Sequence, residues 1–136
     1  MKYVILVPVY NDRESLKLLI ENINHEIKDL NSEISLVVIN DASSQQIIDE
    51  YPYIENFHSI EIINMKENRG HARCIASGLK YIYEKKEFDY VIPMDGDGED
   101  RPEEIKNFIE LSKEVGERSI IAVSYTHLTL PTKQPV

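Results

Sequence analysis

The chain has 136 residues, a length that suits one domain, and its 42% hydrophobic and 29% charged residues predict a folded protein. Its 24 acidic residues outnumber its 15 basic ones, and the resulting net charge of −9 disfavours nucleic acid as a partner. The single cysteine, Cys74, excludes an intramolecular disulfide and fits a reducing compartment. No apolar run approaches the roughly 20 residues that span a bilayer, so we expect a cytoplasmic location.

Short apolar runs alternate with amphipathic stretches in the first half of the chain. Residues 3–7 predict a strand, because they are rich in β-branched residues and are followed by Pro8. Residues 13–28 predict a helix from apolar residues at three- and four-residue steps, with Asn11 or Asp12 as its cap. Residues 34–39 predict a second strand that is apolar on both faces, and a short helix should begin at 41–44.

The same alternation continues in the second half. Strands are predicted at 59–63, 89–94 and 119–123, with a turn at 68–70. A helix over 71–85 should face inward with Ala72, Ile75, Ala76, Leu79, Ile82 and Tyr83. A helix from Pro102 to about Val115 should face inward with Ile105, Phe108, Ile109 and Leu111. This order predicts an α/β fold with a mostly parallel sheet and helices on both faces.

Polar clusters follow each of the first four predicted strands. They are Tyr10-Asn11-Asp12, Asn40-Asp41, Asn68-Arg69-Gly70 and Asp95-Gly96-Asp97. Ligands of parallel α/β sheets bind outside the carboxyl ends of the strands. The convergence of the four clusters at that edge therefore predicts a binding site more strongly than any one motif does.

The Asp95-Gly96-Asp97 motif is the sharpest of these features. Two carboxylates one residue apart, with Glu99 as a third oxygen donor, suit Mg²⁺ or Mn²⁺. The alternative is a polar, solvated turn within the acidic stretch 95–104. A calcium loop is excluded, because its required glycine and glutamate are replaced by Asp100 and Lys106.

Three further positions each allow a functional and a structural interpretation. Asp41 can accept a hydrogen bond from a nucleobase or ribose, or it can cap the next helix. Tyr10 can pack against a base or be a partly buried aromatic residue. Arg73 opens a helix and favours an anion there, or it faces solvent. The four histidines share no metal-ligand spacing, and Cys74 is expected in the core.

Four ordered segments carry a resemblance to a known family. They are VPVYND (7–12), VVINDAS (37–43), ENRGHARCIASGL (67–79) and VIPMDGDGEDRPEEI (91–105). Together they resemble the donor-binding part of an inverting family-2 glycosyltransferase with the GT-A fold. The last segment is most similar to the polyprenyl-phosphate (dolichol-phosphate) mannosyl- or glucosyltransferase branch.

The resemblance implies a role for each matching residue. Pro8, Tyr10 and Asp12 would line the nucleotide site, although the family usually has glutamate at the last of these positions. Asp41 would bind the base near the Ile39 backbone, Arg73 would approach the diphosphate, and Asp95 and Gly96 would contact ribose or phosphate. The metal ligands would be Asp95, Asp97 and Glu99, holding Mg²⁺ or Mn²⁺.

The resemblance also implies partners and limits. The donor would be a nucleoside-diphosphate sugar, and the acceptor a polyprenyl phosphate at the cytoplasmic membrane face in cell-envelope glycan synthesis. Residues 1–123 would form the nucleotide-sugar-binding part, and the irregular tail 124–136 is a loop or sequence foreign to the domain; we favour the second. The catalytic base is expected outside this chain, so the fragment alone should be inactive. The alternative function is a non-catalytic, metal-dependent nucleotide or nucleotide-sugar binding module.

Overall fold

The computed structural model describes residues 1–44, 54–95, 102–115 and 119–120. Its elements are β1 (Lys2–Val9), α1 (Arg13–Glu26), β2 (Glu33–Asn40), β3 (Ser59–Asn64), α2 (His71–Lys85), β4 (Tyr90–Pro93), a 3-10 turn (Pro102–Glu104), α3 (Ile105–Val115) and β5 (Ser119–Ile120). Apart from the interval between β2 and β3, the order of these elements confirms the alternation predicted from the sequence. The short helix expected to begin at 41–44 does not begin there, because these residues are not helical and Ala42 has a left-handed φ of 57°. The rest of that expected helix and the tail 124–136 lie outside the described residues.

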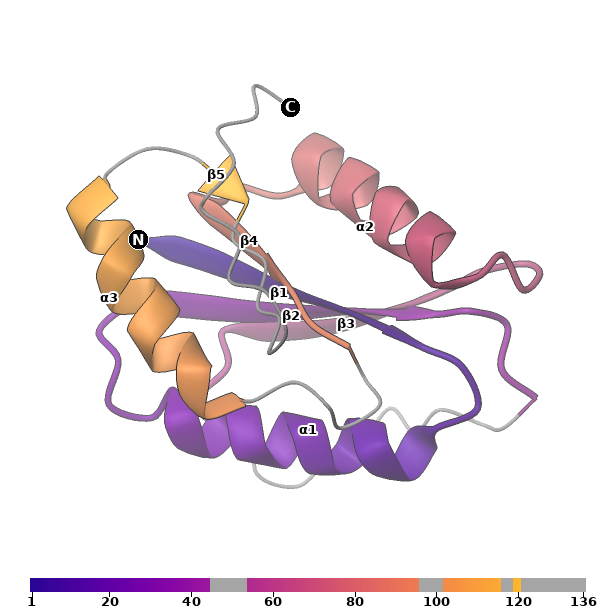
Figure 1. Ribbon diagram of the computed structural model, residues 1–136, viewed down its shortest axis with the longest axis horizontal. Coiled ribbons are helices and arrows are strands. Elements are labelled where there is room, and N and C mark those ends of the chain that lie inside the picture. The colour runs from indigo at the N-terminus through magenta and orange to yellow at the C-terminus, as the bar shows by residue number, and fades with distance from the viewer. Residues whose placement is uncertain (45–53, 96–101, 116–118, 121–136) are drawn as a thin grey trace.

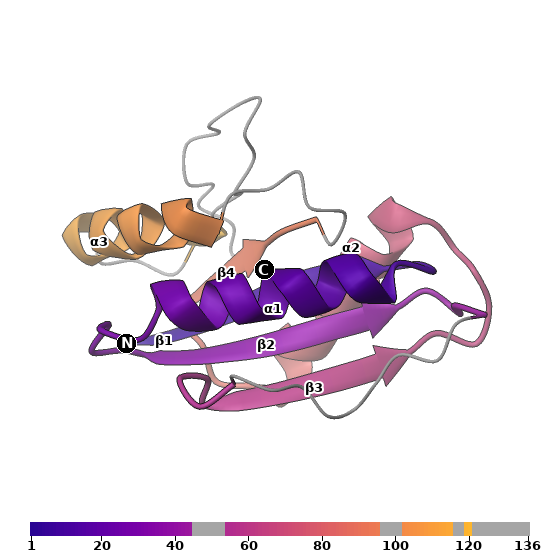
Figure 2. The ribbon, with the colours of Figure 1, turned by 90° about the horizontal axis from the view of Figure 1, so that it is seen from below.

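The strands form one parallel sheet in the order β3-β2-β1-β4-β5. The arrows of β2 and β3 point the same way in Figure 2. The register pairs Val9 with Asn40 and Asn40 with Asn64, so the ends of the first three strands are level. The chain adds strands on one side of β1 and then on the other, which makes the junction of β1 and β4 the switch point where such folds bind ligands.

Helices cover both faces of the sheet, as predicted (Figure 1). Tyr3, Ile5 and Val7 of β1 belong to the buried cluster that includes residues of α1 and α3. Val4 and Leu6 face the other way, into the cluster that contains residues of α2. This alternation follows from the two-residue period of a strand and explains why the strands read as continuous apolar runs.

The packing of α2 differs from the prediction. Its buried residues are Cys74, Gly78 and Ile82, whereas Ala72, Ala76 and Tyr83 are exposed. A Cβ at position 78 would clash with Leu6 Cδ1 and lie 3.2 Å from Ile39 Cγ1. The prediction is confirmed for Ile75, Leu79 and Ile82, which pack into the core on this side of the sheet. The small residues at 74 and 78, which the apolar pattern did not select, let the helix approach the sheet closely.

The predicted inward face of α3 is also wrong at its last position, where Leu111 was expected and Ser112 is found. Leu111 is 44% exposed, and Ser112 is fully buried. A face that begins at Ile105, Phe108 and Ile109 continues to position 112 in a helix of 3.6 residues per turn. Ser112 Oγ lies 2.7 Å from the Tyr3 hydroxyl, and its carbonyl accepts from the Tyr90 hydroxyl at 2.8 Å. The buried serine therefore has polar partners that the apolar pattern did not reveal.

No helix in the described part of the chain is long and apolar enough to cross a membrane.

Candidate functional site

The predicted site residues that the structure describes lie at or just beyond the carboxyl ends of β1, β2 and β4, or in the first turn of α2. Main-chain bonds hold these ends together: Asp41 N donates to Val9 O at 2.9 Å, and Met94 N donates to Leu6 O at 2.8 Å. In addition, the side-chain Nδ2 of Asn40 donates to Asn64 Oδ1 at 2.9 Å. The parallel register thus places the described residues of the polar clusters at one edge, as the sequence predicted.

Asp41 lies at the centre of the contacts at this edge. Its side chain accepts from Arg69 N at 2.7 Å and from Gly70 N at 2.9 Å, one amide on each carboxylate oxygen. Asn68 Nδ2 donates to the Asp41 carbonyl at 3.4 Å. Asp41 is only 4% exposed. The end of β2 is therefore bonded directly to the loop that starts α2.

The surroundings of Asp41 keep its carboxylate ionised. Burial acts to raise the pKa of Asp41, but the amides of Arg69 and Gly70 and the thiol of Cys74 outweigh it and lower the pKa. The Cys74 thiol is fully buried, and this burial, with Asp41 nearby, raises its pKa to about 12. Cys74 is thus a protonated core residue, as predicted, and not a nucleophile.

Left-handed backbone marks the loops after β1 and β2. Asn11 has a φ of 49° and Ala42 a φ of 57°, values that non-glycine residues seldom adopt. Asn11 N donates to Ser43 Oγ at 2.9 Å, and Ser44 N donates to Asn11 Oδ1 at 2.8 Å. These reciprocal bonds join the two loops and explain how the unusual backbone is held.

The remaining residues expected after β1 and β2 differ in exposure. The Tyr10 side chain is 53% exposed, so it is available to a ligand. Asp12 is the N-cap of α1 and accepts from Ser15 N at 3.4 Å, as its capping role predicted. Pro8 and Ile39 are paired and buried within the sheet, so their side chains belong to the core.

Asp95 and the start of α2 form the other side of the edge. Asp95 Oδ1 lies 3.0 Å from His71 Nε2, and Arg73 is exposed two residues further along α2. The spacing of the histidines gave no reason to choose His71. Its position directly after Gly70, at the start of a helix reached from β3, was the signal that could have selected it.

The structure leaves part of the predicted metal site undescribed. Gly96, Asp97 and Glu99 lie outside the described residues. Among residues 1–44, 54–95, 102–115 and 119–120, no three His, Cys, Asp or Glu side chains gather as a metal site. Asp95 supplies one carboxylate at the correct edge, which fits the hard oxygen ligands that Mg²⁺ and Mn²⁺ prefer.

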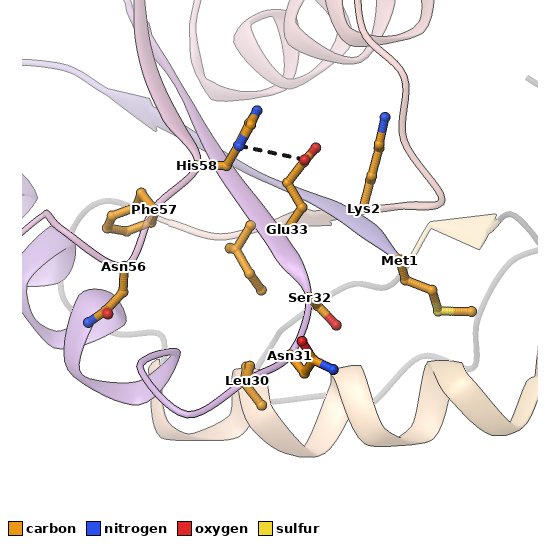
Figure 3. Close-up of a pocket in the computed structure, with 10 residues that line it drawn as sticks. Met1, Lys2, Leu30, Asn31, Ser32, Glu33, Asn56, Phe57 and His58 are labelled. Atoms are coloured by element: carbon orange, nitrogen blue, oxygen red, sulfur yellow. Dashed lines mark ion pairs between the residues drawn. The ribbon is translucent and has the colours of Figure 1, made fainter.

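A depression of about 500 Å³ lies at the opposite, amino edge of the sheet (Figure 3). It is lined by Met1, Lys2, Leu30, Asn31, Ser32, Glu33, Ile34, Asn56, Phe57 and His58. Its charged groups are already paired, Lys2 with Glu87 at 2.8 Å and His58 with Glu33 at 3.5 Å. None of the predicted site residues lines this depression.

Comparisons with known proteins agree with the fold and with the sequence motifs. The family model described as Glycosyl transferase family 2 matches residues 4–133. The undecaprenyl-phosphate 4-deoxy-4-formamido-L-arabinose transferase of Proteus mirabilis (strain HI4320) is 33% identical over 116 residues, which cover 83% of this chain and 34% of that protein. The chain therefore spans about a third of the length of this curated relative.

Solved structures give the same result for the fold. The crystal structure of S. aureus TarS matches with a TM-score of 0.61 and 22% identity, over 84% of this chain and 20% of that one. The structure of S. aureus TarS 1-349 gives the same score and identity and is covered to 33%. The likeness confirms the α/β fold of GT-A type that the sequence predicted.

Proposed function

Since the chain belongs to glycosyl transferase family 2, we propose that it binds the nucleoside-diphosphate sugar in an enzyme that transfers the sugar to an acceptor with inversion. One observation carries the proposal: Tyr10, Asp41, Asp95 and the first turn of α2 lie at the carboxyl edge, beside the switch point of a sheet with this family's fold. Family membership supports the assignment of the donor to that edge.

The acceptor we propose is a polyprenyl phosphate. The Proteus relative is named as an undecaprenyl-phosphate transferase, and the segment 91–105 resembles the same branch of the family. An acceptor of this kind resides in a membrane, so the site would work at the membrane face. In the transfer, an oxygen of the acceptor phosphate would bond to the sugar as the bond to the nucleoside diphosphate breaks. Any proton on that phosphate oxygen passes to a general base within its reach, which we place outside the donor site.

The proposed roles follow the positions at the edge. Tyr10 packs against the base and Asp41 accepts from its imide, with Pro8, Asp12 and the Ile39 backbone lining the site. Arg73 approaches the diphosphate, and Asp95 and Gly96 contact ribose or phosphate.

Mg²⁺ or Mn²⁺ would be held by Asp95, Asp97 and Glu99. When bound, such a cation neutralises the charge that develops on the leaving diphosphate. The side chains would hold the donor so that this charge lies next to the cation and away from water.

The donor site can be tested by thermal unfolding. Mn²⁺ with a nucleoside diphosphate should raise Tm, because a ligand that binds only the folded state stabilises it by about 2.7 kcal/mol at about 100 times Kd. Asp97→Asn should abolish the metal-dependent part of the shift. An equal shift in that variant would remove Asp97 from the site, and no shift in the unaltered chain would refute donor binding.

The base can be tested separately by calorimetry. A carboxylate accepts from the imide of uracil or guanine, and cytosine and adenine lack that donor. UDP or GDP should therefore bind more tightly than CDP or ADP. Equal affinity for the four would contradict the role of Asp41 toward the base and leave the diphosphate contacts standing.

A further inference from the structure

The carboxylate of Asp41 is bonded to the main chain of a different loop, and this contact suggests a second task for it. We propose that Asp41 is a positioning residue of the donor site, which fixes the loop at 68–70 and the first turn of α2 and so controls affinity for the diphosphate. The inference rests on the proposed function and goes beyond a contact between Asp41 and the base.

The carboxylate of Asp41 accepts hydrogen bonds from two successive backbone amides, and we call this contact the Asp41 clamp. Arg69 N and Gly70 N reach different oxygens of the same carboxylate, at 2.7 and 2.9 Å. Gly70, with a φ of +90°, occupies a conformation that residues with a Cβ rarely adopt. Bonds from amides to an ionised carboxylate are stronger than neutral ones, so this loop conformation depends on Asp41.

The contact of Asp41 with this loop matters for α2 because no side chain caps the N-terminus of that helix. Its N-cap is Gly70, which makes no side-chain cap hydrogen bond. Asp41, directly after β2, accepts from the amides of Arg69 and Gly70 and so anchors the residues immediately before the helix. Cys74, one turn into α2, is fully buried, and its thiol hydrogen-bonds Asp41, so the carboxylate is held from the loop and from the helix.

The residues that depend on the clamp are those expected to face the diphosphate. Arg73 lies in the first turn of α2 and is exposed, while His71 contacts Asp95. Asp41 itself is 4% exposed, with both oxygens engaged. A substitution of Asp41 should therefore weaken binding of the diphosphate through the loop, independently of its effect on binding of the base.

The experiment compares a nucleoside with its diphosphate. In Asp41→Asn the carboxamide retains one acceptor oxygen but turns its NH₂ toward the other amide. The ratio of the Kd of uridine to the Kd of UDP cancels any contact between Asp41 and the base. We expect this ratio to fall about tenfold, the effect of losing a charge-assisted hydrogen bond. Hydrogen exchange at the amides of Arg69 and Gly70 should become faster.

A matched control separates positioning from general destabilisation. Asn24 is equally buried, at 4% exposed, and accepts from Asn56 N at 2.9 Å in a loop at the other end of α1. Asn24→Ala should lower Tm and leave the ratio unchanged. Gly70→Ala strains the same loop without altering Asp41, so it should lower the ratio even if Asp41→Asn does not fold.

The outcomes are distinct for this inference and for the proposed function. Equal losses for uridine and UDP in Asp41→Asn, or an unchanged ratio in Gly70→Ala, would overturn the positioning role while leaving the donor site intact. Failure of the unaltered chain to bind UDP or GDP would instead refute the proposed function. Unchanged exchange at the amides of Arg69 and Gly70 in Asp41→Asn would overturn the clamp independently of any ligand.

Discussion

At the carboxyl edge of the sheet, two side chains accept from the backbone amides of neighbouring loops, whereas the ionisable side chains that line the depression at the amino edge pair with other side chains. Asp41 and Asn11 each receive main-chain amides from a different loop, and Gly70 there has a positive φ. At the amino edge, the side chains of Lys2 and His58 pair with nearby carboxylates around an open depression.

The difference shows that a hollow alone does not identify a site in this fold. The depression of about 500 Å³ lies at the edge where the side chains of Lys2, Glu33 and His58 are already paired. The carboxyl edge instead concentrates strained backbone, an exposed aromatic ring and a buried ionised carboxylate. Strain and perturbed titration are features that recur at functional sites. The following predictions test whether the two edges respond separately.

The largest effect should come from Gly78→Val, which disturbs the helix that links both edges. The added side chain would clash with Leu6, which is fully buried and cannot move to solvent. We expect a loss of about 3 kcal/mol in the free energy of unfolding, since overpacking a core costs this much at its upper range. Urea unfolding measures it.

Compensation at Leu6 provides the control for that change. Leu6→Ala would vacate the space beneath Gly78 and is destabilising alone, because it leaves a cavity. Combined with Gly78→Val, it should cost clearly less than the sum of the two single losses. Simple additivity would show that the contact between α2 and β1 does not limit packing.

A smaller loss is expected from Tyr90→Phe at the amino edge. The Tyr90 hydroxyl is buried and donates to the Ser112 carbonyl at 2.8 Å, so its removal leaves a buried acceptor without that donor. We expect about 1–2 kcal/mol less stability and no change in UDP affinity. Tyr83→Phe, 48% exposed on α2, should stay within about 0.5 kcal/mol. A fall in UDP affinity in Tyr90→Phe would mean that the edges are coupled.

A pH-dependent contribution is expected from Glu61 of β3. Hydrogen bonds from Lys86 and from Tyr81, the latter at 2.5 Å, lower the pKa of its carboxyl below the usual 4.5. A lowered folded-state pKa gives stability that is present above the unfolded value and lost as pH falls through the folded value. Glu61→Gln should therefore cost about 0.5–1 kcal/mol at neutral pH, as a partly exposed pair does.

The difference between Glu61→Gln and the unaltered chain should shrink below pH 4.5, measured by urea unfolding across pH. Glu84→Gln, at an exposed position on α2, is the matched control and should leave the stability profile nearly unchanged. If the stability difference between Glu61→Gln and the unaltered chain stayed constant below pH 4.5, Glu61 would stabilise the fold by packing and not by its charge.

The sequence predicted the sheet and its binding edge because both depend on local patterns. Apolar runs gave the strands, and parallel topology required their polar ends to meet. The inward face of α2 was predicted at Ile75, Leu79 and Ile82 but missed at Gly78, because close approach needs small residues, which carry no apolar signal. The contacts of Asp41 with Arg69 and Gly70 join positions far apart in the chain. No spacing rule specifies them, since they depend on how two loops meet in space.

The smallest effect on stability, and the sharpest separation of the edges, should come from His71→Ala. The pair of His71 with Asp95 is solvent-exposed, so its loss should change the unfolding free energy by no more than about 0.5 kcal/mol. The imidazole nevertheless contacts Oδ1 of a proposed metal ligand, and partners of this kind orient the ligand. Calorimetry with Mn²⁺ and UDP should show a loss of about tenfold in affinity, the lower range for such partners. His71→Asn, whose amide can still donate, should recover part of it. Tighter binding in His71→Ala would mean that His71 competes with the ligand for Asp95 instead of orienting it.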